Sequence, residues 1–166
     1  MLRRSLEQLE HAEAIERRRV DAAVRERLLA EAHTALEIAD LAAGRGLLDR
    51  AVGEAYEAAL RASIVLLASA GYRLRKGQGH HLAALEAALA ILGPDWEPLL
   101  SRVDDARAVR NAGLYGTLDA APAVESHFER VRDDAARMLA EAERRSRRPA
   151  SAPPPAPSRP RPRARR

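Results

Sequence analysis

Apolar residues recur along this chain at the three- and four-residue spacing of amphipathic helices, and no stretch alternates as a strand would. The first stripe places an apolar residue at every fourth position: Val20, Val24, Leu28, Ala32 and Leu36. Similar stripes predict helices over residues 48–70, 82–92 and 95–113, and a last helix that begins at the cap-like segment 119–122 and continues to Leu139. Such a series predicts an all-α fold, a four-to-five-helix antiparallel up-and-down bundle over residues 20–146.

One segment of the second predicted helix is apolar on nearly every side. It runs from Ser63 to Ala68 and contains isoleucine, valine and two leucines in succession. A helix with no polar face is stable only when other elements cover it all round. We therefore expect this helix at the centre of the bundle.

The two ends of the chain differ from the bundle. Residues 1–19 keep helical spacing at Leu2, Leu6 and Leu9 and then become mostly charged, which predicts a charged N-terminal helical extension, either continuous with the next helix or weakly packed. Residues 147–166 contain seven of the ten prolines, seven arginines and no acid. A segment of this composition buries too little apolar surface to order itself, so we expect a disordered basic tail. The tail suits either a solubilising role or an arginine-rich arm for nucleic acid or anionic lipid.

Charge and composition narrow the function. The formal net charge is +4, but residues 1–146 carry 21 basic groups against all 24 acids, so the basicity belongs to the tail and indicates no nucleic-acid surface on the bundle. The absence of cysteine excludes disulfides, thiolate zinc sites and cysteine nucleophiles. No histidine pair has metal-ligand spacing, so we expect no metal and no cofactor. Without a bilayer-length apolar run or a signal peptide, we expect a cytoplasmic protein that does not contact membranes.

A basic, glycine-punctuated connection is the first candidate site. Residues 71–81 bring together three cations and two histidines ahead of a helix N-terminus: Arg73, Arg75, Lys76, His80 and His81. Free helix N–H groups and nearby cations can hold a phosphate. The alternative is an ordinary solvated connection whose glycines permit the turn.

The second candidate site lies near the end of the fourth predicted helix. At 3.6 residues per turn, Arg107, Asn111 and Tyr115 align on one edge, with Arg110 beside them. Two guanidiniums, an amide and a phenol could bind a phosphate and a base, or form a hydrogen-bond network at a dimer interface. For a single arginine, the simplest alternative is an ion pair with Asp104 or Asp105.

Several short segments resemble the HEPN superfamily of helical proteins. They are residues 55–60, the Gly71-Tyr72-Arg73 and Gly79-His80-His81 segments, and Arg110-Asn111 followed by Tyr115-Gly116. The resemblance spans roughly residues 20–140. It implies an α-helical bundle, often a homodimer that brings two Arg-Asn segments together, and many members are toxins paired with a nucleotidyltransferase. The family's ribonucleases carry an arginine and a histidine with four to six residues between them.

This sequence departs from that motif at its histidine. Tyr115 stands where the histidine would follow Arg110, and a phenol with a reference pKa near 10 is a poor base at pH 7. The letters from Arg75 to His80 also spell the motif, but they precede the third predicted helix. We therefore expect a non-catalytic module that binds an RNA or nucleotide phosphate, or a partner protein. Two alternatives remain: a metal-independent ribonuclease toxin using Arg110 with Tyr115, His80 or His81, and a dimerising interaction or antitoxin module.

Overall fold

Six α-helices and a two-stranded sheet make up the part of the chain that the computed structural model describes, which is residues 3–75, 77, 79–115 and 124–147; the side chains of residues 111–115 lie outside this description. In chain order the elements are α1 (Leu6–His11), β1 (Ile15–Arg17), α2 (Ala22–Ala43), α3 (Leu48–Ser69), β2 (Tyr72–Leu74), α4 (His80–Leu92), a 3₁₀ turn (Pro94–Trp96), α5 (Glu97–Tyr115) and α6 (Glu125–Ser146). The all-α prediction is confirmed. The predicted cap at 119–122 and the tail from Arg148 onward fall outside the described residues.

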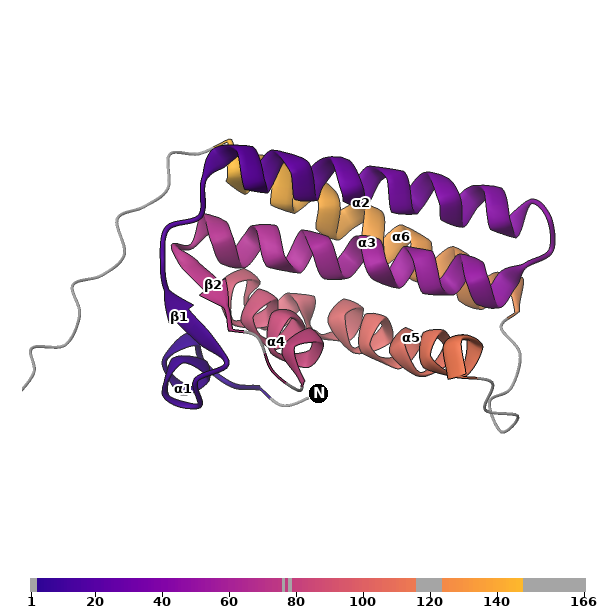
Figure 1. Cartoon of the computed structure of the whole chain (residues 1–166). Helices are drawn as coiled ribbons and strands as arrows, with labels where there is room; N and C mark the ends of the chain where they lie inside the picture. Colours follow the sequence, from indigo (N-terminus) through magenta and orange to yellow (C-terminus); the bar gives the residue numbers. More distant parts are fainter. Residues whose placement is uncertain (1–2, 76, 78, 116–123, 148–166) are drawn as a thin grey trace, which may run out of the picture.

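The four long helices form the bundle. Successive members of the series α2, α3, α5 and α6 run in opposite directions along it, and α4 is inserted between α3 and α5 (Figure 1). The turn between α4 and α5 contains Gly93 at a φ of 95°, a left-handed value that favours glycine, followed by Pro94 at the first position of the 3₁₀ turn. These two residues end α4 and set the direction of α5.

Helix α3 occupies the centre, as its sequence predicts. It packs against α2, α4, α5, α6 and β2. Within the segment from Ser63 to Ala68, only Ile64 is more than marginally exposed. The Ser63 hydroxyl is buried but donates to the Ala59 carbonyl at 2.9 Å, so the one polar side chain of this segment is satisfied within its own helix.

The N-terminal segment differs from the prediction. Only Leu6–His11 is helical, and Ile15–Arg17 pairs as an antiparallel strand with Tyr72–Leu74, in a region for which no strand was expected. The segment is also firmly packed, because Leu9 and Ile15 are almost completely buried against Leu67. The signal for these strands is long-range, since the partners lie nearly sixty positions apart, and three residues carry too little local pattern to reveal them.

The connection from β2 to α4 positions the candidate site. β2 lies at the end of the bundle where α3 finishes, whereas α4 begins beside the middle of α3, close enough for His81 to contact Tyr56 (Figure 1). The first residue of α4 therefore lies back along the bundle from the end of β2 (Figure 1). Gly79 makes the turn into α4 at a φ of 77°.

Candidate functional site

A polar cluster forms where α3, α4 and α5 meet. It contains Tyr56 and Glu57 from α3, the adjacent His80 and His81 at the start of α4, and Arg107 and Arg110 from α5. We call these six residues the Tyr56 cluster. The structure thus brings together residues from both of the segments that the sequence singled out, through a tyrosine that the sequence did not single out.

Tyr56 is the residue that joins the two sides. Its hydroxyl oxygen lies 3.3 Å from Nδ1 of His81, and the guanidinium carbon of Arg110 lies 5.8 Å from the centre of its ring. Tyr56 itself is fully buried. An imidazole and a guanidinium far apart in the sequence therefore contact one fixed phenol. The only sequence signal for Tyr56 was its place in the segment 55–60 that carries the family resemblance.

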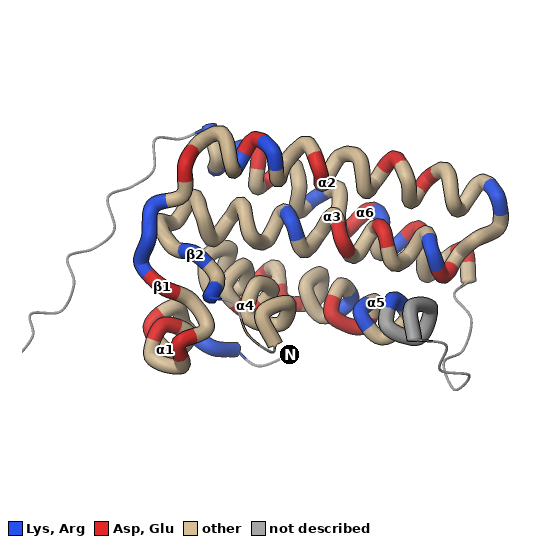
Figure 2. Tube along the Cα trace, in the orientation of Figure 1, with Lys and Arg blue, Asp and Glu red and all other residues tan. Residues whose placement is uncertain are grey.

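The arginines of the cluster also pair with carboxylates. An Nη of Arg110 lies 2.7 Å from Oε1 of Glu57, whose other oxygen accepts from Arg61 at 2.8 Å. Nε of Arg107 donates to Asp104 at 3.0 Å, which confirms the simplest alternative for that arginine. Figure 2 shows the resulting mixture of acidic and basic positions along α3 and α5. The pairs hold the guanidiniums in place and reduce the local positive charge.

The environment shifts two pKa values in the cluster. Burial lowers the pKa of His81 below its usual 6.5; the neighbouring His80, Arg110 and Arg107 lower it further, while Glu57 opposes them. Burial also raises the pKa of Tyr56 to about 12, with Glu57 adding to the shift and the two arginines opposing it. At pH 7 the cluster therefore presents a neutral imidazole and a protonated phenol.

His80 is held in one tautomer. Its Nδ1 lies 2.9 Å from the carbonyl oxygen of Gly77, and since a carbonyl only accepts, Nδ1 donates its hydrogen. In the neutral ring the lone pair is then on Nε2. His80 is exposed, and its ring meets that of His81 edge-on with centroids 4.3 Å apart. The lone pair of Nε2 is therefore held in a fixed direction on an exposed ring.

A groove of about 750 Å³ lies beside the cluster. Arg110 and Glu57 line it together with Gly53. The other lining residues are two arginines, two acids and the start of α3 with the turn before it: Arg50, Arg61, Asp49, Glu54 and residues 46–48. Gly53 faces α5: a Cβ at this position would lie 3.7 Å from Cγ of Arg110, an ordinary van der Waals distance. The groove is large enough to admit a nucleotide-sized group next to Arg110.

The remaining predicted residues divide into two groups. Arg73 forms an ion pair with Glu16 across the β1–β2 ladder, and Nη1 of Arg75 lies 3.5 Å from Oε1 of Glu13. These two cations therefore hold the N-terminal segment against the bundle and do not belong to the Tyr56 cluster. Lys76 and the side chains of Asn111 and Tyr115 lie outside the described residues. The predicted alignment of Arg107, Asn111 and Tyr115 therefore stays a prediction.

Two further observations concern the described residues. None of their helices combines the length and apolarity that a membrane span requires. In the same ranges, no group of three or more histidine or acidic side chains is arranged to hold a metal ion.

No family model, curated protein or solved structure was found to match this chain.

Proposed function

We propose that this chain is a HEPN-like helical module that binds an RNA or nucleotide phosphate at the Tyr56 cluster. The observation that carries the proposal is the convergence of Arg110 and His81 on Tyr56 from two different helices. The family resemblance, with its homodimer and its nucleotidyltransferase-type partner, belongs to the same proposal and rests on the short sequence motifs.

The chemistry of the cluster suits a phosphate. A guanidinium has five N–H donors, more than the bond from Arg107 to Asp104 uses. Arginine binds phosphate oxygens through charge-assisted hydrogen bonds in a planar fork, and a carboxylate-anchored arginine loses little side-chain entropy on binding. A bound phosphate would also favour the protonated form of His81, which then adds a third cationic contact.

Binding is tested with a 5′-labelled single-stranded RNA by fluorescence anisotropy in EDTA at low salt. We expect Arg110→Gln to weaken binding about tenfold, because it removes a charge-assisted contact to phosphate. Arg144→Gln is the matched control, since Arg144 is an exposed, carboxylate-paired arginine on α6. Both variants retain the whole basic tail, so any affinity supplied by the tail is common to them.

Equal affinity of Arg110→Gln and Arg144→Gln would contradict the proposal. If RNA and nucleotides bind neither the wild-type protein nor its variants at low salt, the alternative of a pure protein-interaction module is favoured instead. A circular-dichroism melt of each variant shows whether a loss of binding follows from a loss of folding.

A metal-independent ribonuclease is the second candidate, and the geometry of His80 favours it. In such a reaction, Nε2 of His80 would take the proton from a 2′-hydroxyl and the 2′-oxygen would attack phosphorus. A 2′,3′-cyclic phosphate would form, while the 5′-oxygen leaves with a proton from a second acid. Arg110 would stabilise the charge on the phosphate oxygens in the transition state.

Incubation with RNA in EDTA distinguishes the two candidates. The control is His33→Asn, because His33 is an exposed histidine on α2. Loss of RNA cleavage in His80→Asn, with cleavage retained in His33→Asn, would show that the protein is a ribonuclease that depends on His80.

A further inference from the structure

A second pocket, separate from the Tyr56 cluster, forms where the N-terminal segment meets the end of α4. Its volume is about 650 Å³, within the range of small-molecule sites. The walls come from residues 3–7, Arg17, Tyr72, the end of α4 and the Gly93-Pro94 turn. The pocket exists because the N-terminal segment packs against α4.

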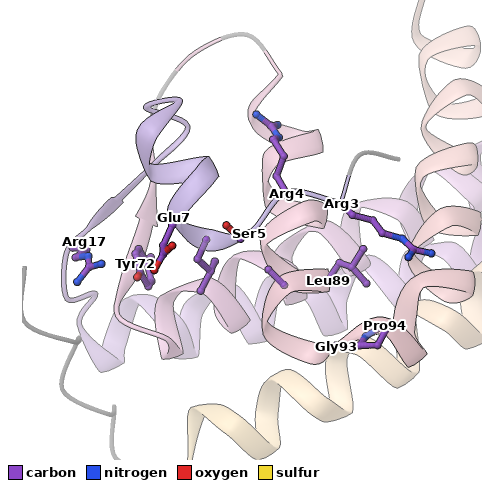
Figure 3. Close-up of a pocket in the computed structure, with 11 residues that line it drawn as sticks. Arg3, Arg4, Ser5, Glu7, Arg17, Tyr72, Leu89, Gly93 and Pro94 are labelled. Carbon is purple, nitrogen blue, oxygen red and sulfur yellow. The ribbon is translucent and has the colours of Figure 1, made fainter. Parts of the chain in front are cut away.

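The pocket combines an aliphatic floor with a basic rim. Leu6, Leu89, Ala90 and Pro94 supply the apolar surface. Three arginines and a single carboxylate are the charged residues among those that line it: Arg3, Arg4, Arg17 and Glu7. Figure 3 shows Arg17 beside Tyr72 at one end and Arg3 at the other, with Leu89 between them.

The arginines are held in position before any ligand arrives. Nε of Arg17 donates to both carboxylate oxygens of Glu10 at 3.1 and 3.0 Å, and its guanidinium lies 5.8 Å from the centre of the Tyr72 ring. Arg4 binds the fully buried Glu86 through Nε at 2.9 Å and through Nη2. Cations fixed in this way lose little entropy when they bind an anion. Arg17 is the least exposed of the three, with 20% of its side chain accessible against 31% for Arg4 and 68% for Arg3, so water screens its charge less.

We propose that this pocket binds a small aliphatic carboxylate. Its hydrocarbon chain lies on Leu6, Leu89 and Ala90, and its carboxylate pairs with Arg17. The complement of an aliphatic floor with a cationic rim is an anion that carries an apolar body. An aliphatic chain fits the floor better than an aromatic ring does, because the one aromatic wall, Tyr72, is already covered by the Arg17 guanidinium.

The proposal is tested by isothermal titration of the full chain with decanoate, decanol and acetate. We expect decanoate to bind at least about tenfold more tightly than either of the other two, since decanol lacks the charge and acetate lacks the chain. Equal binding of decanol and decanoate, or no decanoate binding, would overturn it.

Two variants locate the site. Ala90 is exposed and helical, so Ala90→Phe narrows the pocket without disturbing the core, and Ala30→Phe places the same side chain at an exposed position of α2. We expect about a tenfold loss of decanoate affinity in Ala90→Phe and none in Ala30→Phe. Arg17→Gln should reduce decanoate affinity and leave decanol unchanged. Wild-type affinity in both Ala90→Phe and Arg17→Gln would place the ligand elsewhere and refute the assignment. Circular dichroism confirms that each variant is folded.

Discussion

At the scale of single residues, the charge of His81 depends on the groups that the fold packs around its ring. Burial lowers its pKa below 6.5, and His80, Arg110 and Arg107 lower it further. Its Nδ1 faces the buried Tyr56 hydroxyl. The free protein therefore holds His81 neutral at pH 7. A bound anion beside the ring would raise the pKa of His81, because it offsets the positive charge of the neighbouring arginines. Binding of an anion and protonation of His81 are therefore linked.

Lowering the pH from 7.5 to 5.5 should strengthen RNA binding at the Tyr56 cluster. The bound phosphate raises the pKa of His81, so affinity increases as the pH falls through that raised value and decreases again as the pH rises. One additional charge-assisted contact corresponds to roughly a tenfold change in affinity. Fluorescence-anisotropy titrations of the labelled RNA at several pH values measure this change in affinity.

The variant His81→Asn should flatten this pH profile, whereas His33→Asn should leave it intact. The arginines of the tail and the cluster stay charged throughout the range and cannot produce such a profile. An unchanged slope in His81→Asn would exclude His81 as the titrating group.

At the scale of elements, the N-terminal segment is bound to α4 by an ion pair with one buried member. Glu86 is completely buried in α4, and one of its oxygens, Oε1, lacks a hydrogen-bond partner within the described residues. Its other oxygen accepts two hydrogen bonds from Arg4. Removing Arg4 would leave a buried carboxylate without its cation, which is more costly than losing an exposed pair.

Replacing Arg4 by methionine should therefore lower the free energy of unfolding by about 2–3 kcal/mol. The double variant Arg4→Met with Glu86→Leu should recover most of this loss, because two apolar side chains replace both charges at once. Urea denaturation measures the three free energies.

Arg3 provides the comparison for this prediction. Its pair with Glu97 is exposed, so Arg3→Met should lower the free energy of unfolding much less than Arg4→Met does. A double variant no more stable than Arg4→Met alone would mean that Glu86 is not the source of the cost.

At the scale of the whole molecule, α3 connects nearly every part of the fold. It contacts the other long helices, α4 and β2. Most of its buried residues belong to the core of the bundle, and Leu67 packs with Leu9 and Ile15 of the N-terminal segment. It also carries Tyr56 and Glu57. A change in the packing of α3 is therefore transmitted to the bundle and to the candidate site together.

Truncation of a core leucine of α3 should destabilise the entire bundle. Leu66 is fully buried, so Leu66→Ala should lower the free energy of unfolding by about 3 kcal/mol through lost transfer energy and a residual cavity. Leu41, at the end of α2, is 61% exposed. Leu41→Ala should therefore change the free energy of unfolding by less than about 0.5 kcal/mol. Similar losses in the two variants would contradict the central position of α3.

Much of the fold could be predicted because helix formation depends on local pattern. The stripe from Val20 to Leu36 predicted α2, and the all-apolar segment from Ser63 to Ala68 predicted the centre of the bundle, since side chains three and four positions apart share a helix face. The helix begins after Val20, Val24 is 37% exposed, and the buried face of α2 consists of alanines. The β1–β2 pairing could not be predicted, because its stability comes from a partner segment and from the burial of Ile15.

The sequence by itself determined the helices, the bundle, and the residue types available for binding a phosphate. Tertiary structure alone decided which of those residues meet. The start of α4 lies beside the middle of α3, which places His81 against Tyr56, whereas Arg73 and Arg75 pair with the N-terminal segment. Local spacing sets which face of a helix a side chain occupies. The neighbour that this face meets depends on the packing of the whole chain.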